Sequence, residues 1–274
     1  MTRDSRPRRK INWFKYAPPM RFYPLAGKLV PWFAAAAAVL GAIGLFVGFA
    51  VAPTDAQQGD AYRIIFLHVP TAWLSMIIYL ALAFWAALGL IFNVRLASMM
   101  ASALAPTGAL MTFLALWTGA LWGKPTWGTW WVWDARLTSE LILLFLYLGL
   151  MSLHAAIDDT RRADRATAVL ALVGVVNVPI IYFSVQWWNT LHQGASVSLS
   201  SAPSIAAPML AGMLIMTLAV WAYCIAVVLM RVRVIILGRE RHAAWAEEVM
   251  GGAASSRGPR VTYQNASLGG RTST

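Results

Sequence analysis

Six long apolar segments, separated by short polar connections, dominate the pattern of the chain. A helix needs about 20 apolar residues to cross the hydrocarbon core of a bilayer, and each segment is close to that length. The pattern therefore predicts an all-α integral membrane protein with six transmembrane helices. The predicted helices cover residues 31–52, 64–92, 96–122, 139–157, 166–186 and 205–230.

Composition supports this class, because 59% of the 274 residues are hydrophobic and only 12% are charged. A soluble domain with a normal polar surface does not have such a balance. We expect a six-span domain at 31–230, between a basic tail at 1–30 and a flexible tail at 231–274. An alternative for the first segment is a signal peptide ending near Ala50-Val51-Ala52, but its apolar core is longer than such peptides have.

Lysine and arginine predict the orientation. Of the 22 cations, all but Arg63, Lys124 and Arg136 fall in the two tails or in the connections after the second and fourth segments. Cytoplasmic loops carry the excess of basic residues, so both termini are expected in the cytoplasm. The net charge of +11 then reflects topology and attraction to anionic lipid, and it does not indicate nucleic-acid binding.

Several kinds of chemistry are excluded by missing motifs. Cys224 is the only cysteine, so the chain cannot form an internal disulfide, a CxxC redox pair or a CxxCH haem attachment. No GxxxxGK[ST] phosphate-binding loop occurs. Any ATP-driven step must therefore be performed by a partner.

The stretch Trp122 to Thr138, WGKPTWGTWWVWDARLT, carries five tryptophans between two apolar segments, on the outer side. If Pro125 opens a short helix, four of the tryptophans fall on one face. Such a face suits a large planar partner at the membrane boundary. The alternative is an aromatic belt, since tryptophan is enriched at bilayer interfaces.

Two histidines lie on the same side as this stretch. His68 is at the outer end of the second segment, and His192 is in the last outer loop. Two imidazoles, aromatic faces and outer cations together indicate an open haem site. A closed zinc site is less consistent with the sequence, because it usually needs four nitrogen or sulfur ligands. For His68 alone, the alternative is a hydrated polar residue at the end of a membrane helix.

Other features are read as packing features. Gly44 and Gly48 form a GxxxG pattern that favours a close helix contact, although small residues are common in membrane helices generally. Pro106 and Pro179 predict kinks, and Asn177 places an amide near mid-bilayer. His154, at the inner end of the fourth segment, is a poor ligand candidate.

The tryptophan stretch also carries a resemblance. Trp127-Gly128, Trp131, Trp133-Asp134 and Arg136-Leu137-Thr138 match the WGxxWxWDxRLT motif of the haem-handling proteins of cytochrome c maturation. The flanking motifs, His68-Val69-Pro70 and residues 187–192 with Gln193, resemble those of the short six-span branch of this family, the cytochrome c maturation protein C (CcmC) type.

This resemblance implies a non-enzymatic subunit of the bacterial inner membrane that works with an ABC-type ATPase, its membrane subunits and a small single-span subunit. It implies haem b as the bound and transported ligand, presented on the periplasmic face to a membrane-anchored haem chaperone. By position in the motifs, His68 and His192 would be the axial ligands. The haem and chaperone surface would consist of Trp127, Trp131, Trp133, Asp134 and Arg136.

Two other classes remain open. A membrane redox subunit of the cytochrome b kind also holds haem by paired histidines, but it normally buries ligand pairs within its helices. A solute transporter places its polar site near mid-membrane between broken helices, and only Asn177, Pro106 and Pro179 favour that reading.

Overall fold

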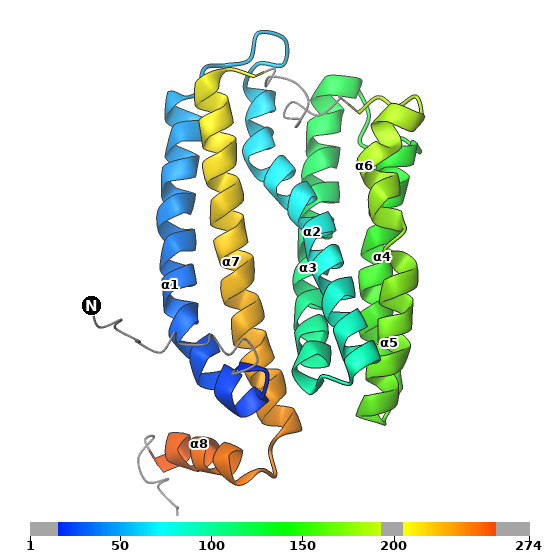
Figure 1. Cartoon of the computed structure of the whole chain (residues 1–274). Helices are drawn as coiled ribbons and strands as arrows, with labels where there is room; N and C mark the ends of the chain where they lie inside the picture. Colours follow the sequence, from blue (N-terminus) through cyan, green and yellow to red (C-terminus); the bar gives the residue numbers. More distant parts are fainter. Residues whose placement is uncertain (1–15, 193–204, 256–274) are drawn as a thin grey trace, which may run out of the picture. The chain divides into compact units, whose positions relative to one another are not determined.

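The computed structural model describes residues 16–192 and 205–255. The first part of the predicted basic tail, the serine-rich run after His192 and the end of the chain lie outside the described residues. Every regular element of the described part is a helix (Figure 1). In chain order these are α1 (Pro19–Phe46), η2 (Val47–Val51), η3 (Asp60–Ile64), α2 (Ile65–Phe92), α3 (Arg95–Trp127), α4 (Ala135–Ala156), α5 (Thr160–Gly174), α6 (Asn177–Trp187), α7 (Ala207–Arg239) and α8 (Ala244–Ser255).

The predicted all-α, six-span class is confirmed, since six helical segments of the described part are long and apolar enough to cross a membrane. They are α1 with η2, η3 with α2, α3, α4, α5 with α6, and α7. The first and last extend beyond the predicted apolar segments, to Pro19 and Arg239, and α8 forms within the segment predicted as a C-terminal tail. The flexibility of the two tails stays a prediction.

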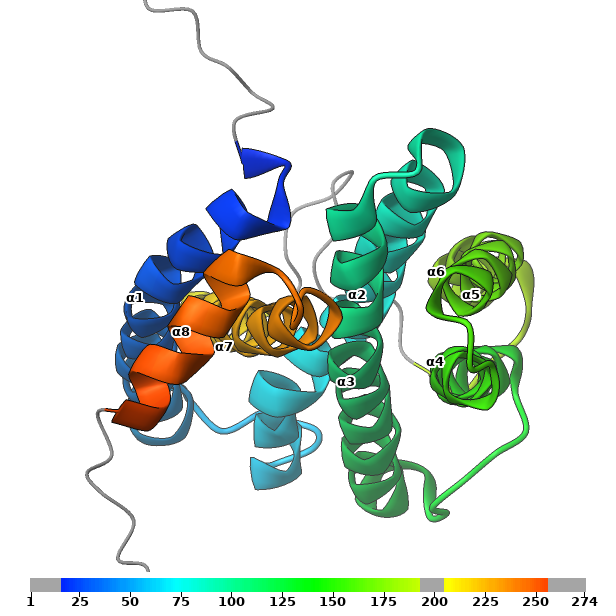
Figure 2. The same ribbon diagram turned by 90° about the horizontal axis from the view of Figure 1, so that it is seen from below.

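The chain divides into two compact units, residues 1–236 and 237–274. In the first unit α1 lies beside α7, α2 and α3 pack together in the middle, and α4 lies with α5 and α6 (Figures 1 and 2). The loop that follows η2 and the segment between α3 and α4 lie at one end of this unit (Figure 1). The second unit contains α8.

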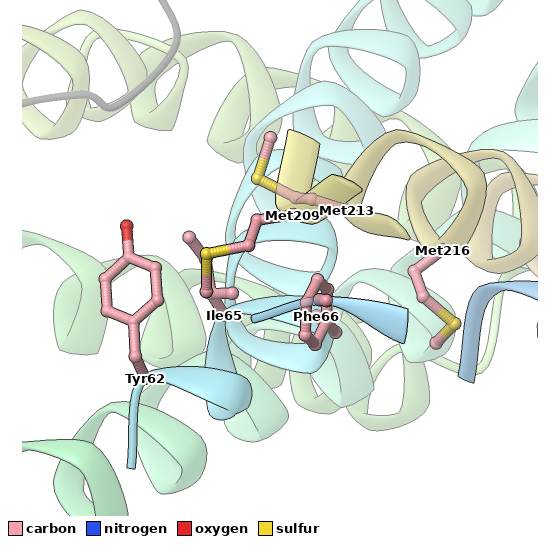
Figure 3. Close-up of a cluster of buried hydrophobic side chains, with 7 residues drawn as sticks. Tyr62, Ile65, Phe66, Met209, Met213 and Met216 are labelled. Atoms are coloured by element: carbon pink, nitrogen blue, oxygen red, sulfur yellow. The ribbon is translucent and has the colours of Figure 1, made fainter. Parts of the chain in front are cut away.

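The GxxxG pattern marks a close contact, as predicted. A Cβ atom on Gly44 would lie 2.7 Å from Met216 Sδ of α7, and one on Gly48 would lie 2.7 Å from Phe66 Cδ2 of α2. Phe66 is fully buried in an apolar cluster with Ile65 and the methionines of α7 (Figure 3). This cluster joins η3, α2 and α7.

The predicted short helix of tryptophans is wrong. Helix α3 continues through Pro125 and ends at Trp127, because Gly128 adopts a left-handed conformation with φ 77° and caps it. Asp134 then caps the start of α4, where its side chain accepts a hydrogen bond from the Leu137 amide. Residues 128–134 between these two caps are not helical, so their tryptophans do not form a helix face.

The fifth span is interrupted at residues 175–176, between α5 and α6. Pro179 has no amide hydrogen to donate to the Val175 carbonyl, which instead accepts from the Val178 amide in a tighter turn. The Asn177 amide donates to the Ser139 carbonyl of α4 at 2.9 Å. Asn177 thus binds α6 to α4, which is a packing role.

Candidate haem site

A cavity of about 650 Å³, counted to its open mouth, lies among α2, α3, α4 and the segment after α6. Its walls are mainly apolar and aromatic. The polar side chains that line it are His68, Thr126, Arg136, Glu140 and His192.

The two predicted ligand histidines both line this cavity. Their ring centroids are 6.2 Å apart and the ring planes are inclined by 35°. Because imidazole nitrogens bind metals at about 2 Å, two rings on opposite sides of one metal ion have their centres about 6 Å apart. Among the described residues no group of three or more histidine, cysteine, aspartate or glutamate residues is placed to hold a metal ion.

His68 is oriented by the helix beside it. Its Nδ1 atom is 3.1 Å from the Thr118 hydroxyl of α3, and that hydroxyl donates to the Leu114 carbonyl at 2.6 Å. The Thr118 oxygen therefore accepts from an Nδ1–H group, which leaves the lone pair on Nε2, the atom that can bind a metal. Gly119 makes this position possible, since a Cβ atom there would lie 3.0 Å from His68 Cε1.

Trp122 lines the cavity but is not among the site residues predicted from the sequence. Its ring contacts the His68 ring edge-on with centroids 5.6 Å apart, and it contacts Tyr62 of η3 in the same way. The indole nitrogen donates to the side chain of Gln58 at 2.7 Å. Trp122 thereby connects His68 to the loop after η2. Its only signal in the sequence is its position at the start of the tryptophan stretch.

The aspartate of the motif holds the second histidine in place. Asp134 accepts the Leu137 amide with one carboxylate oxygen and the Thr190 hydroxyl with the other. The Thr190 oxygen in turn accepts the backbone amide of His192 at 3.0 Å. Asp134 does not line the cavity, so its role in this geometry is to position His192.

Arg136 links the same elements and also lines the cavity. Its Nη1 atom donates to the Ile181 carbonyl of α6 at 2.7 Å. A guanidinium has five N–H donors, so others can reach an anionic ligand. The other two outer cations are placed differently, because Arg63 binds the Gly48 and Ala52 carbonyls and Lys124 binds the Gly128 carbonyl. Neither lines the cavity.

Glu140 lies one turn after Arg136 in α4 and is 5% exposed. Its Oε1 atom is 2.7 Å from the Ser75 hydroxyl of α2, whereas its Oε2 atom is buried with no hydrogen-bond partner. A buried polar atom without a partner costs about 1–3 kcal/mol.

The predicted site residues thus separate into two groups. His68, Trp127, Arg136 and His192 line one cavity, and the Trp127 and His192 rings have centroids 6.2 Å apart. Asp134, Trp131 and Trp133 lie outside it. Trp133 is 78% exposed and contacts the half-buried Trp131 edge-on.

Comparison with known proteins identifies the family of this chain. The family model described as Heme exporter protein C matches residues 12–247. Heme exporter protein C of Escherichia coli (strain K12) is 48% identical over 236 residues, which cover 85% of this chain and 94% of that protein. The protein of the same name from Bradyrhizobium diazoefficiens is 54% identical over 204 residues, covering 74% of this chain and 77% of the relative. The chain therefore belongs to the Heme exporter protein C family.

Proposed function

We propose that this protein binds haem in the cavity and hands it on for the biogenesis of c-type cytochromes. The observation that carries the proposal is the pair of imidazole rings, 6.2 Å apart, across a cavity with aromatic walls. Its relatives are named as haem exporters, which supports haem as the cargo. Haem b is the form expected, since the chain has no CxxCH motif to attach it covalently.

Each part of the site has a separate task. His68 and His192 bind the iron from opposite faces through neutral imidazole nitrogens. Neither histidine has to lie in the lipid interior to do so. Arg136 pairs with a haem propionate, since guanidinium and carboxylate form strong charge-assisted hydrogen bonds. Trp122 and Trp127 contact the macrocycle. Because none of these tasks changes a covalent bond of the cargo, the protein acts as a carrier subunit and not as an enzyme.

The exposed tryptophans outside the cavity provide the contact for handover. Trp133 and Trp131 present apolar, planar area next to the segment that holds His192, and aromatic residues contribute strongly at interface centres. The expected acceptor is a membrane-anchored haem chaperone on the periplasmic face of the bacterial inner membrane. The resemblance implies an ABC-type ATPase, its membrane subunits and a small single-span subunit as partners. An ATPase partner is consistent with the lack of a phosphate-binding loop in this chain.

Purification in detergent with natural partners tests the proposal. The expected result is a six-coordinate, bis-imidazole haem spectrum together with co-purifying chains that include an ATPase. A protein that binds no added haem would contradict the haem function. Quinol-dependent turnover of the bound haem would instead favour a redox subunit of the cytochrome b kind.

A further inference from the structure

Glu140 is the buried charged group of the cavity that the proposed function does not use. It is more than nine-tenths buried, it lines the cavity, and one of its oxygens has no hydrogen-bond partner. Arg136 lines the same cavity from one turn earlier in α4, since residues four apart share a helix face. The two side chains form no ion pair within 4.0 Å, so each can contact a group that lies between them.

The contacts of Ser75 bear on the protonation of Glu140. The Ser75 oxygen lies 2.7 Å from the Ala72 carbonyl and 2.7 Å from Glu140 Oε1. A serine hydroxyl has a single hydrogen and can donate fully to only one of these acceptors. Both contacts can be full hydrogen bonds when Glu140 carries a proton and donates it to the Ser75 oxygen.

The surroundings of Glu140 also favour a neutral carboxyl group. An ionised carboxylate is costly to bury unless it is paired, and Arg136 does not touch it. The other titratable groups that face this region are His68 and His192 in the cavity and Tyr147 of α4. The Tyr147 hydroxyl donates to the Ser75 carbonyl at 2.8 Å and thus does not reach the carboxyl group.

We propose that Arg136 and Glu140 together bind one carboxyl group of the cargo, and that Glu140 shares a proton with it. This inference rests on the proposed haem function and adds a residue to its site. With the proton on Oε2, Glu140 donates to the cargo carboxylate while Ser75 turns to donate to Oε1. Arg136 supplies the positive charge on the other side of the carboxylate. Binding of the anionic cargo then takes up one proton from solvent whenever Glu140 is ionised beforehand.

The pH dependence of affinity should differ between haem and haem dimethyl ester, in which both propionates are esterified. Haem affinity should fall as pH rises and Glu140 ionises, by up to about tenfold per pH unit for a single linked proton. The ester has no carboxylate, so its affinity should not depend on Glu140. Between about pH 7.5 and 9 histidine protonation does not interfere, because imidazole is neutral there.

Glu140→Gln is the variant of choice, since its amide can donate to the cargo and accept from Ser75 without titrating. Absorbance titrations of the purified complex with haem and with the ester, across this pH range, should show a falling haem affinity in the wild type and a constant one in the variant. Asp158→Asn, which changes an exposed carboxylate between α4 and α5, is the matched control and should follow the wild type. Parallel pH curves for wild type and Glu140→Gln would overturn the inference while leaving the haem function intact.

Proton uptake by the wild type provides a measurement that needs no variant. In weakly buffered solution with a pH indicator, at a pH at which the haem affinity of the wild type has begun to fall, haem binding should take up about one proton per site, and ester binding should take up none. Equal uptake with both ligands contradicts the inference alone. Absence of a bis-imidazole spectrum with either ligand contradicts the proposed function, and the inference with it.

Discussion

His68 is held from three directions at the residue scale. Thr118 fixes its Nδ1 atom, Trp122 contacts its ring edge-on, and Gly119 leaves room for its Cε1 atom. Such contacts limit the side chain to one rotamer, so little conformational entropy remains to be lost on binding. They also explain how a histidine in the first turns of a membrane helix can be presented to a ligand in a defined tautomer.

Replacing either histidine should change the coordination of the haem iron. His68→Ala and His192→Ala are each expected to give a five-coordinate haem or to lose haem, as measured by absorption and electron paramagnetic resonance spectra. His154→Ala is the control, because His154 pairs with Asp164 at 3.1 Å and does not line the cavity. An unchanged bis-imidazole spectrum in either of the first two variants removes that residue from the site.

Acid should release haem from the wild type, because the lone pair that binds iron is the one that accepts a proton. A spectral titration toward low pH measures this release.

Gly119→Ala tests the space beside His68. The added Cβ would lie 3.0 Å from His68 Cε1, which is closer than most such contacts, so the imidazole must shift by a few tenths of an ångström. We expect weaker haem binding and a perturbed spectrum, with little change in the thermal stability of the free protein. Gly149→Ala is the control, since the nearest atom to its Cβ is 3.9 Å away. Equal haem spectra for the two variants would show that Gly119 has no role in the site.

Arg136→Ala should weaken haem binding by one to two decades in Kd. The physical reason is the loss of a charge-assisted hydrogen bond to a propionate, worth about 1.5–3 kcal/mol. This variant also loses the bond to the Ile181 carbonyl, so binding of haem dimethyl ester serves as the control. If the ester loses as much affinity as haem, Arg136 acts only by holding α6 against α4.

At the element scale, the site depends on the ends of helices more than on the helices themselves. The segment between the Gly128 cap of α3 and the Asp134 cap of α4 is bound to the end of α6 through Thr190 and the His192 amide. These hydrogen bonds fix the position of His192 relative to the tryptophan motif. Trp133 of the same segment is therefore the direct neighbour of the residue that holds His192 in place.

The double variant Trp131→Ala, Trp133→Ala should reduce transfer of haem to the chaperone while haem binding is retained. Neither ring lines the cavity, and Trp133 exposes apolar area that an interface would bury. Transfer is measured with purified acceptor by separating the two proteins after mixing. Trp32→Ala, a similarly exposed tryptophan on α1, is the matched control. Normal transfer by the double variant would mean that these rings form only a membrane belt.

The six spans could be predicted from the sequence because apolar length alone determines which segments can cross a bilayer. The path of residues 128–134 could not, since a glycine in a left-handed conformation and an aspartate cap override the helical spacing of the tryptophans. The parity of six spans predicted His68 and His192 on one side of the membrane, whereas the tryptophan motif did not separate Arg136 from Asp134 in role. Glu140 and Trp122 became site residues only through the packing of α4 and α3 against α2, which no spacing along the chain reports.

At the scale of the whole molecule, the loop after η2 and the segment between α3 and α4 lie at one end of the first unit (Figure 1). Six spans return the chain to the side on which it began, so both termini should lie opposite the site. The excess of arginine and lysine in the tails and inner connections favours the cytoplasm for that side. Haem bound near His68 then faces the periplasm, where c-type cytochromes are completed according to the proposed function.

Cysteine labelling tests this orientation. In a Cys224→Ser background, which removes the single and buried native thiol, Gln57→Cys places a thiol in the exposed loop after η2, and Asp158→Cys places one in the exposed connection after α4. A membrane-impermeant maleimide added to intact spheroplasts should label the cysteine at position 57 and leave the one at 158 unlabelled. After the membranes are opened, both should react, which controls for accessibility. Labelling of position 158 alone in intact spheroplasts would invert the topology and place the haem site in the cytoplasm.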